Sequence, residues 1–436
     1  MGQDQRTPLR RWIWGVVLAC GLAACSMGVQ LSQPPNLYLD GRNYPASLVP
    51  EVLQVVDAPI FYVTDRAPVR TEGRVTGYGT GRSDAMAFGA TQIRFGAVDW
   101  EDLVARTHVD RGGRISRLDL VALREITRFP DIPLPARRQS GELRVTPEAR
   151  SEYEAITREF QNAIRAEVQR TGNRRILVYV HGVSNEFDNS VQTLANLWHF
   201  TGRRSIPVSF TWPAGNAGLL GYFRDREAAD FSVYHAKEFL RMLAEIPEVE
   251  DIDIVAHSRG TSVMTQALRE MVIYNRGKGL RPKLAMKTGT LILAAADLDI
   301  GVVRQRLASE RVSEAFEQIN IYVNPDDVAL RLSSFLTKYP RVGVAGADDF
   351  KPNELAVERK QGLTHFIRVE GASGSGSHSY FRNNPAVLSD IVLALRTRAF
   401  PGGTLRPLEE DPDTIWRLQP NYPLERLPNL IVEVER

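Results

Sequence analysis

The sequence predicts an α/β fold with a mostly parallel, doubly wound sheet. Apolar runs that are too short for helices alternate with helical or loop segments, as expected of parallel strands buried on both faces. Such runs occupy residues 176–180, 252–256, 290–296, 319–324 and 365–369. With 24% charged and 43% hydrophobic residues, the chain has a globular composition and is large enough for one full-sized core. We therefore expect a single domain over residues 57–400.

The N-terminal segment has the order of a secretory signal. Three arginines precede the apolar run at residues 12–19, and the sequence Leu-Ala-Ala-Cys follows at residues 22–25. The run is too short for a comfortable transmembrane span. Leu-Ala-Ala-Cys resembles a bacterial lipobox, which implies removal of residues 1–24 and lipid attachment to the Cys25 thiol. Ser26 after this cysteine fits sorting to the outer membrane, so we expect a cell-envelope lipoprotein facing the periplasm.

Both cysteines of the chain, Cys20 and Cys25, lie in this segment. Cys20 matches the lipobox less well and would be lost with the signal peptide. The mature domain then has no thiol for a disulfide, a metal site or a cysteine nucleophile. The following residues are rich in Gln, Pro, Asn and Ser. Such a composition predicts a flexible tether over residues 25–56, between the lipid and the domain.

Residues 59–129 are expected to supply the first strands and an N-terminal elaboration, with an opening strand at 61–64. Thr146 and Pro147 form the cap and first position of a helix that Gly172 ends. Its apolar residues recur along one face, which predicts a core-facing helix. The segment 401–436 contains six prolines. We expect it to wrap around the surface without regular structure.

The run at residues 252–256 leads to a candidate nucleophile. Ser258 stands in Ala256-His257-Ser258-Arg259-Gly260, and apolar residues at helical spacing follow from 261 to 274. A sharp strand-to-helix turn with small neighbours lifts a serine hydroxyl off the end of a sheet, as in a nucleophile elbow. The alternative interpretation is that Ser258 only caps the helix.

The run at residues 176–180 ends in His181-Gly182-Val183. A buried strand followed by glycine allows a backbone amide to face a reacting carbonyl group. The expected oxyanion donors are the amides of Val183 and of Arg259, the residue after the nucleophile. We expect His181 to hold this loop by hydrogen bonds rather than to act in acid/base catalysis.

Four stretches resemble a known family: residues 180–187 (VHGVSNEF), 210–214 (FTWPA), 225–227 (DRE) and 256–260 (AHSRG). They are similar to the bacterial esterase/lipase-like branch of the α/β-hydrolase superfamily. The resemblance runs from about residue 61 to residue 395. It implies an α/β-hydrolase fold and a catalytic Ser, acid and His in that chain order, but no particular substrate.

The acid is expected after the strand at 319–324, because catalytic groups gather beyond the carboxyl ends of parallel strands. Asp327 is favoured, because in the resembling family an Asp followed by x-Ala-Leu occupies this turn, as Asp327-Val328-Ala329-Leu330 does here. Asp326 is an alternative acid, or a cap of the helix that follows. Asp297 and Asp299, at the end of the preceding strand, also stay open.

His378 is the expected catalytic base. It follows the last predicted strand and a flexible stretch at 371–377, and the family shows the same His-Ser-Tyr-Phe pattern. The alternative is a solvated loop histidine. The other histidines are expected away from the chemistry: His108 and His199 on other segments, His235 in a helical pattern, His365 at the start of a strand, and His257 pointing away from the nucleophile.

The sequence contains no Walker-type loop, dinucleotide glycine fingerprint or His/Glu helical pair, so we expect no cofactor and no metal. The net charge of +2 and the scattered arginines argue against nucleic acid. The expected function is a serine hydrolase of carboxylic esters, acting on a small-molecule or lipid ester. An acyltransferase or thioesterase with the same residues, and a non-catalytic envelope scaffold, are the alternatives. The apolar, glycine-punctuated stretch at 213–224 is expected to be a lid, an acyl-group wall or a core-packed loop.

Overall fold

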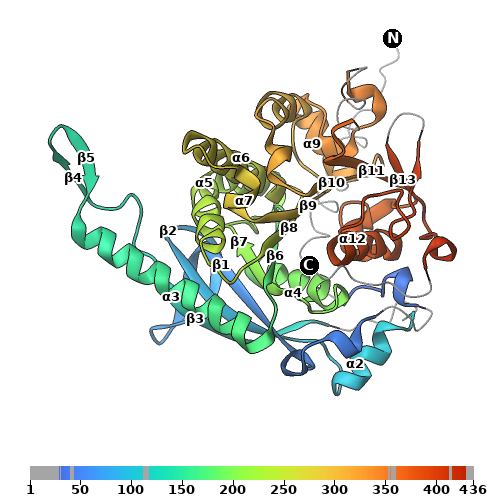
Figure 1. Ribbon diagram of the computed structural model, residues 1–436, viewed down its shortest axis with the longest axis horizontal. Coiled ribbons are helices and arrows are strands. Elements are labelled where there is room, and N and C mark those ends of the chain that lie inside the picture. Colours follow the sequence, from blue (N-terminus) through green and yellow to red (C-terminus); the bar gives the residue numbers. More distant parts are fainter. Residues whose placement is uncertain are drawn as a thin grey trace, which may run out of the picture.

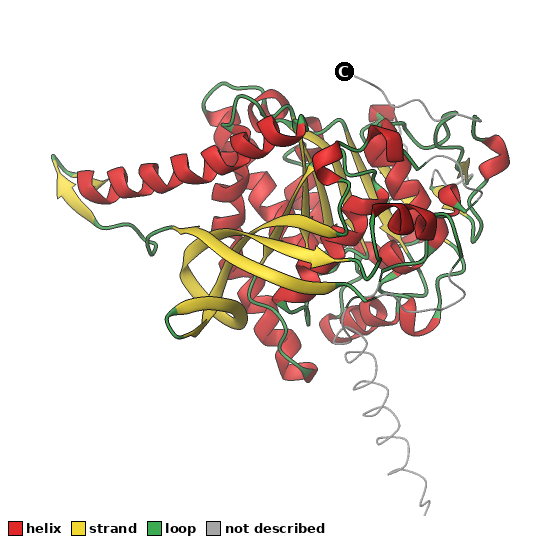
Figure 2. Ribbon diagram, turned by 90° about the horizontal axis from the view of Figure 1, so that it is seen from below, coloured by secondary structure: helices red, strands yellow, loops and turns green. Residues whose placement is uncertain are grey.

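A computed structural model describes residues 29, 31–39, 44–110, 117–351, 354, 360–411 and 415–428. The signal segment 1–24 and Cys25 lie outside the described residues. Within them, one large sheet forms the centre of the molecule (Figure 1). A separate hairpin stands at the end of a long helix that projects from the body (Figure 2).

The described part of the large sheet has the strand order β12-β13-β11-β10-β9-β8-β6-β7-β1-β2-β3. The pairs from β1 through β7, β6, β8, β9, β10 and β11 to β13 are parallel, and the flanking pairs are antiparallel. The strands are β1 (Asp57–Thr71), β2 (Arg74–Arg94), β3 (Asp119–Arg128), β6 (Arg175–Val180), β7 (Ile206–Thr211), β8 (Asp251–His257), β9 (Thr288–Ala294), β10 (Gln318–Val323), β11 (Thr364–Val369), β12 (Glu409–Glu410) and β13 (Trp416–Leu418). Each predicted apolar run lies on one of these strands, which confirms the doubly wound α/β fold.

Helices cover both faces of the sheet. The α-helices are α2 (Trp100–Thr107), α3 (Pro147–Thr171), α4 (Phe187–Phe200), α5 (Gly218–Ala244), α6 (Gly260–Gly277), α7 (Pro282–Met286), α8 (Ile300–Val302), α9 (Val328–Thr337), α11 (Tyr380–Asn383) and α12 (Pro385–Thr397). One apolar cluster joins the sheet to α3, α5 and α6, and the other joins it to α4 and α12. Alternate residues of a strand serve the two clusters, as the period of two requires: Val178 belongs to the first and Tyr179 to the second.

The predicted helix start at Thr146 is confirmed. The Thr146 hydroxyl accepts a hydrogen bond from the Ala149 amide, Pro147 occupies the first position of α3, and Gly172 ends the helix with a φ of +73°. Its last turns pack Phe160, Ile164 and Val168 into the core. The hairpin of β4 (Ala136–Gln139) and β5 (Glu142–Val145) lies at its free end (Figures 1 and 2).

The tether expected over residues 25–56 differs from what is found. In the described residues 31–39 and 44–56, short 3-10 helices pack on the domain at Asn36–Tyr38, Ala46–Leu48 and Glu51–Leu53. Leu37 and Tyr38 are fully buried, and the Tyr38 hydroxyl donates to the carbonyl oxygen of Phe200 in α4 at 2.6 Å. The physical reason is that α12 is buried on every side, so a further segment must cover it.

The C-terminal segment also differs from the prediction of an irregular wrap. Its strands β12 and β13 extend the sheet, with β13 parallel to β11. Arg406 is fully buried and pairs with Asp390 of α12, the Arg406 Nη2 and Asp390 Oδ2 atoms being 2.7 Å apart. Paired buried charges and the buried side chains of Leu408 and Leu418 hold the segment in place.

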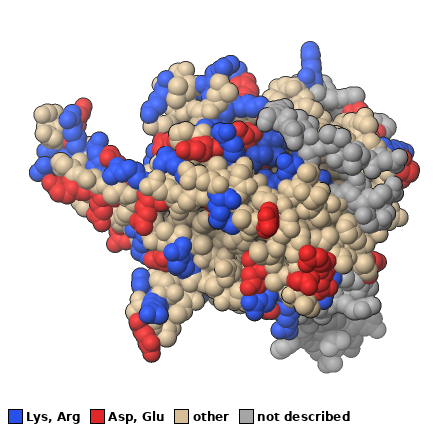
Figure 3. All heavy atoms as spheres, turned by 60° about the horizontal axis from the view of Figure 1, so that its bottom comes forward, with Lys and Arg blue, Asp and Glu red and all other residues tan. Residues whose placement is uncertain are grey.

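Lys and Arg are interspersed with Asp and Glu over the face shown in Figure 3, and no single-sign stripe crosses that face. Among the described residues, no helix combines the length and apolar character needed to cross a membrane.

Candidate active site

Ser258 lies at the sharp turn between β8 and α6. Its φ is +52°, a left-handed conformation that costs a non-glycine residue about 1–3 kcal/mol. The turn is held by the Ser258 amide, which donates to the carbonyl oxygen of Ala294 in β9 at 3.0 Å. Gly260 is required for close packing, because a Cβ there would lie 2.3 Å from the His181 carbonyl oxygen. The strand, strained serine and helix together form the predicted elbow.

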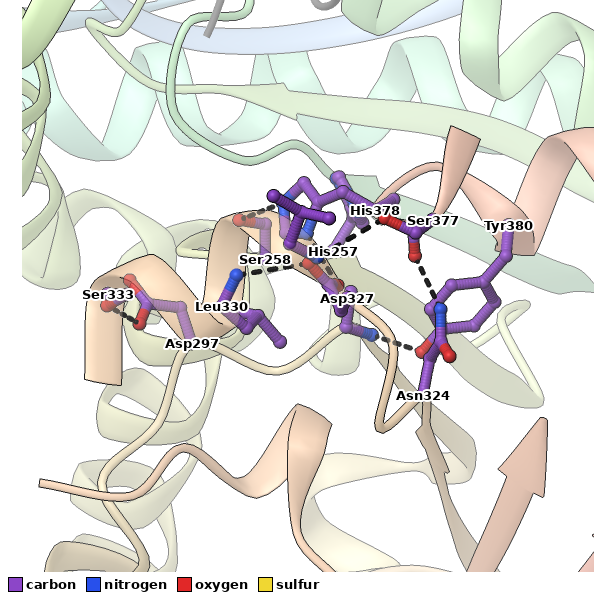
Figure 4. Close-up of polar contacts among 12 residues, drawn as sticks. His257, Ser258, Asp297, Asn324, Asp327, Leu330, Ser333, Ser377, His378 and Tyr380 are labelled. Atoms are coloured by element: carbon purple, nitrogen blue, oxygen red, sulfur yellow. Dashed lines mark hydrogen bonds and ion pairs between the residues drawn. The ribbon is translucent and has the colours of Figure 1, made fainter. Parts of the chain in front are cut away.

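His378 and Asp327 complete a chain of hydrogen bonds to Ser258 (Figure 4). The His378 Nε2 atom is 2.9 Å from Ser258 Oγ, and its Nδ1 atom is 2.8 Å from Asp327 Oδ2. Asp327 is fully buried at the N-terminus of α9, where its Oδ1 accepts from the Leu330 amide at 3.0 Å. Both carboxylate oxygens are therefore engaged, which holds the imidazole in one orientation.

The alternative acids lie elsewhere. Asp326 is exposed, and Asp299 caps α8 by accepting from the Val302 amide. Asp297 is buried but accepts hydrogen bonds from the hydroxyls of Tyr222 and Ser333. Within the described part of the chain, none of these carboxylates is hydrogen-bonded to His378. Asp326 does not cap α9 either, because Asp327 is the N-cap of this helix.

The pKa of the His378 imidazole is raised above its ordinary value of 6.5. Burial alone would lower this pKa, but the charge of Asp327 and its hydrogen bond favour the protonated ring, and the charge of Asp297 adds to them. The imidazole is therefore a stronger base than an exposed histidine.

The loop after β6 lies directly against Ser258. A Cβ at Gly182 would lie 2.6 Å from the Ser258 Cβ, so only glycine fits there. The next amide, that of Ser184, donates to Asp225 Oδ2 at 2.7 Å and fixes the loop. Neither the Val183 amide nor the Arg259 amide donates to another described residue. The two predicted oxyanion donors thus make no hydrogen bond within the described residues, and their catalytic role stays a prediction.

His181 holds this loop, as predicted. Its Nδ1 donates to the Gly182 carbonyl oxygen at 2.8 Å, and its Nε2 accepts from the Trp212 amide at 3.1 Å. Burial, together with the charge of Arg66, lowers the pKa of His181 well below 6.5. A permanently neutral ring suits a structural role.

Arg66 is a residue that the sequence did not single out. Its Nη1 donates to the Ala214 carbonyl oxygen after β7, and its Nη2 donates to the Asn185 carbonyl oxygen after β6, both at 2.7 Å. Nη2 also lies 3.2 Å from His181 Nε2. Burial lowers the pKa of Arg66 to about 10, so the side chain is still charged at neutral pH. One guanidinium of β1 therefore ties the loops that follow β6 and β7.

His257 was expected to point away from Ser258, and the structure shows that it contacts His378 instead. Its ring lies 4.9 Å from the His378 ring, and its Nε2 donates to the His378 carbonyl oxygen at 2.9 Å. Burial, and then the charge of His378, lower the pKa of His257 well below 6.5. Asn324 supports the same loop through its Nδ2, which donates to the carbonyl oxygens of Ala372 and Ser377 at 2.8 Å.

The stretch expected to be a loop at 213–224 is mostly helix, because α5 begins at Gly218. Tyr222 points inward, and its hydroxyl bonds to Asp297 and Ser333. Leu220 and Phe223 are 73% and 45% exposed, so the packed-loop alternative does not hold for them. Helix formation allows one side to pack while the other faces solvent.

Comparison with known families connects this geometry to a defined group. A family model described as "Alpha/beta hydrolase of unknown function (DUF900)" matches residues 156–396, more than half of the chain. The chain belongs to this alpha/beta-hydrolase family. The part that matches the DUF900 model contains Ser258, Asp327 and His378, whereas β1 to β5 precede it. A search of curated proteins found no match.

Membership of the DUF900 family supports the predicted superfamily and identifies the protein as an alpha/beta hydrolase. The match is narrower than the expected resemblance, which began near residue 61. Arg66, which holds the loop after β6, is therefore outside the matched region. Among the described residues, no three His, Cys, Asp or Glu side chains are grouped as metal ligands.

Proposed function

We propose that this protein is a serine hydrolase that cleaves carboxylic esters through an acyl-enzyme intermediate. The observation that carries the proposal is the hydrogen-bond chain from Asp327 through His378 to Ser258. A nucleophile, a base within reach of it and an acid that orients the base are the parts that this chemistry needs.

In the first half-reaction, the Ser258 oxygen attacks the ester carbonyl carbon while its proton passes to His378 Nε2. The carbonyl oxygen becomes an oxyanion held by the Val183 and Arg259 amides. The bond to the alcohol oxygen then breaks, and the alcohol leaves with the proton from His378. In the second half-reaction water attacks the acyl-Ser258 ester, His378 takes the water proton and returns it to Ser258, and the carboxylic acid is released.

An activity screen tests this proposal directly. The purified protein is incubated with p-nitrophenyl esters of graded acyl length, and release of p-nitrophenol is followed. In parallel, it is treated with a fluorophosphonate probe, which labels an activated serine. We expect hydrolysis of at least one ester and labelling at Ser258 by peptide mass spectrometry. A protein that neither labels nor hydrolyses any ester would contradict the proposal.

The raised pKa of His378 predicts a pH profile. Below this pKa the imidazole is protonated and cannot accept the Ser258 proton, so activity is lost as the pH falls through it. We expect the acid limb of kcat/KM to have its midpoint above 6.5. The check is kcat/KM against pH with an uncharged ester. The exposed Asp326→Asn variant should keep the midpoint, and a midpoint below 6.5 in the unmodified protein would contradict the assignment.

We further propose a lipid anchor at Cys25, which would hold the enzyme at the periplasmic side of the outer membrane. The support is the order of basic residues, apolar run and Leu-Ala-Ala-Cys in the sequence. Several acyl chains on one cysteine bind a bilayer stably, whereas a single chain does so only marginally. A lipid or small-molecule ester in the envelope would then be the substrate.

Cys25→Ser should block both lipid labelling and signal-peptide maturation, because the thiol is the acceptor of the lipid. The measurement is metabolic labelling with an alkyne fatty acid, with fractionation of membranes. A chain that begins at Ser26 should be soluble and keep its esterase activity. That start keeps Val29, which is buried against the domain. Lipid label on the Cys25→Ser variant would overturn the anchor.

A further inference from the structure

The side chain of Arg259 is a buried cation beside the nucleophile. Arg259 follows Ser258 at the N-terminus of the 18-residue helix α6, and it is only 7% exposed. Its amide has the proposed oxyanion role, but its guanidinium has no part in the triad. A buried guanidinium normally has most of its donors paired, since an unpaired charge in the interior is costly.

The guanidinium of Arg259 is poorly paired. Its Nε is buried without a hydrogen-bond partner among the described residues. Its Nη1 makes one long hydrogen bond, of 3.4 Å, to the carbonyl oxygen of Asp297. The nearest carboxylate oxygen, Asp297 Oδ2, is 3.8 Å from Nη1, which is beyond hydrogen-bonding distance.

The carboxylate of Asp297 is already used by other groups. Its Oδ1 accepts from the Ser333 hydroxyl at 2.9 Å and lies 3.2 Å from Arg341 Nε. Its Oδ2 accepts from the Tyr222 hydroxyl at 3.2 Å. Two arginines thus share one aspartate, and this buried group of three carries one excess positive charge.

This group is electrostatically close to the catalytic imidazole. The charge of Asp297 contributes to the raised pKa of His378, and Figure 4 shows Asp297 beside Ser333 of α9. The N-terminus of α6, where Arg259 lies, also adds partial positive charge at this place. An anionic group on an ester bound at Ser258 would be attracted both by the excess positive charge of this group and by the helix N-terminus.

We propose that Arg259 binds an anionic oxygen group of the substrate, a carboxylate or a phosphate, close to the scissile ester bond. This inference rests on the proposed esterase function and narrows its substrate class to anionic esters. A guanidinium matches such groups in geometry and charge. Arg259 is therefore a specificity residue through its side chain, in addition to the oxyanion role of its amide.

Matched substrate pairs test the inference. In the first pair the anion is on the acyl side: p-nitrophenyl hydrogen adipate against its neutral methyl ester. In the second it is on the alcohol side: 1-butyrylglycerol 3-phosphate against 1-butyrylglycerol. The readout is the ratio of kcat/KM for the anionic over the neutral member, because a ratio cancels changes in the shared chemical step. We expect the unmodified protein to prefer the anionic member of at least one pair.

Arg259→Gln should lower that ratio by about ten- to a hundred-fold, the usual effect of losing a hydrogen bond to a charged group. Arg259→Lys should keep part of the preference, because it retains the charge. The matched control is Arg331→Gln, which removes the same side chain from an exposed position of α9 and should leave the ratio unchanged. Fluorophosphonate labelling verifies that each variant has a folded active site.

The outcomes separate the two proposals. Three results would overturn the anion site and leave the serine nucleophile standing. They are equal kcat/KM within both pairs, labelling without cleavage of any member, and a preference that survives Arg259→Gln. A purely structural role of Arg259 would lower both members of a pair equally and also overturns it. If the unmodified protein neither labels nor cleaves any member, the proposed function is overturned, and this inference with it.

Discussion

Replacement of Ser258 by alanine is expected to abolish ester hydrolysis and fluorophosphonate labelling, with a loss of turnover on the order of a million-fold. The hydroxyl is the only group lost, and the His378 imidazole then has no proton to accept from the nucleophile. The measurements are the p-nitrophenyl ester assay with enzyme titrated to its detection limit, and gel fluorescence of the labelled protein.

The fold should be retained, because the turn is held by the Ser258 backbone and not by its side chain. Circular dichroism and thermal unfolding of the variant provide this control. Ser262, near the start of the same helix, offers a matched change: Ser262→Ala also removes a hydroxyl, and we expect it to label and hydrolyse normally. Labelling of the Ser258→Ala protein at the unmodified level would sink the nucleophile assignment.

Asp327→Asn is expected to reduce turnover by about ten-thousand-fold. The amide nitrogen of asparagine is a donor, so the His378 ring loses the acceptor that holds Nδ1–H and turns Nε2 toward Ser258. Because asparagine is as good a helix cap as aspartate, α9 should keep its start. The comparison of kcat for purified variants, alongside their unfolding temperatures, measures the effect.

The neighbouring Asp326→Asn is the matched control, since it makes the same substitution one position away on an exposed side chain. It should keep turnover close to that of the unmodified protein. Asp297→Asn should change activity less than Asp327→Asn, because its carboxylate does not contact the imidazole. If Asp326→Asn or Asp297→Asn is the crippling change, the acid has been assigned to the wrong carboxylate.

The parts of the site that the sequence predicts are those at strand ends. Ser258 and Asp327 directly follow apolar runs that are too short for helices, and such runs locate the catalytic edge of a parallel sheet. His378 also follows the last predicted strand. It could be assigned only with the family resemblance, because the glycine-rich stretch before it does not indicate where the imidazole lies. The Ser, acid, His chain order then leaves few other residues that could take these three roles.

Arg66 could not be found in this way. Two of its partners are backbone carbonyl oxygens, which leave no pattern in the sequence. Its side-chain neighbour, His181, is 115 positions away in the chain, so no local motif links the two residues. His257 was misjudged because strand alternation predicts which face a side chain takes, but not that a distant loop returns to cover it. The packed N-terminal segment did leave a signal: between Ala386 and Leu395 every residue except Ser389 and Asp390 is apolar, and such a helix needs cover on most sides.

The position of Arg66 also bears on where this enzyme can be divided. The matched family region begins at residue 156, yet β1 pairs along β7, and its Thr64 hydroxyl donates to the Thr211 carbonyl oxygen. A fragment trimmed to residues 156–396 would keep every reacting group and leave an open, hydrogen-bonding edge on β7. It would also release the two loops that Arg66 holds, after β6 and after β7. The unit that packs around the site is thus larger than the region that the family model matches. An exchange of N-terminal strands between relatives would have to carry this arginine and its carbonyl partners together.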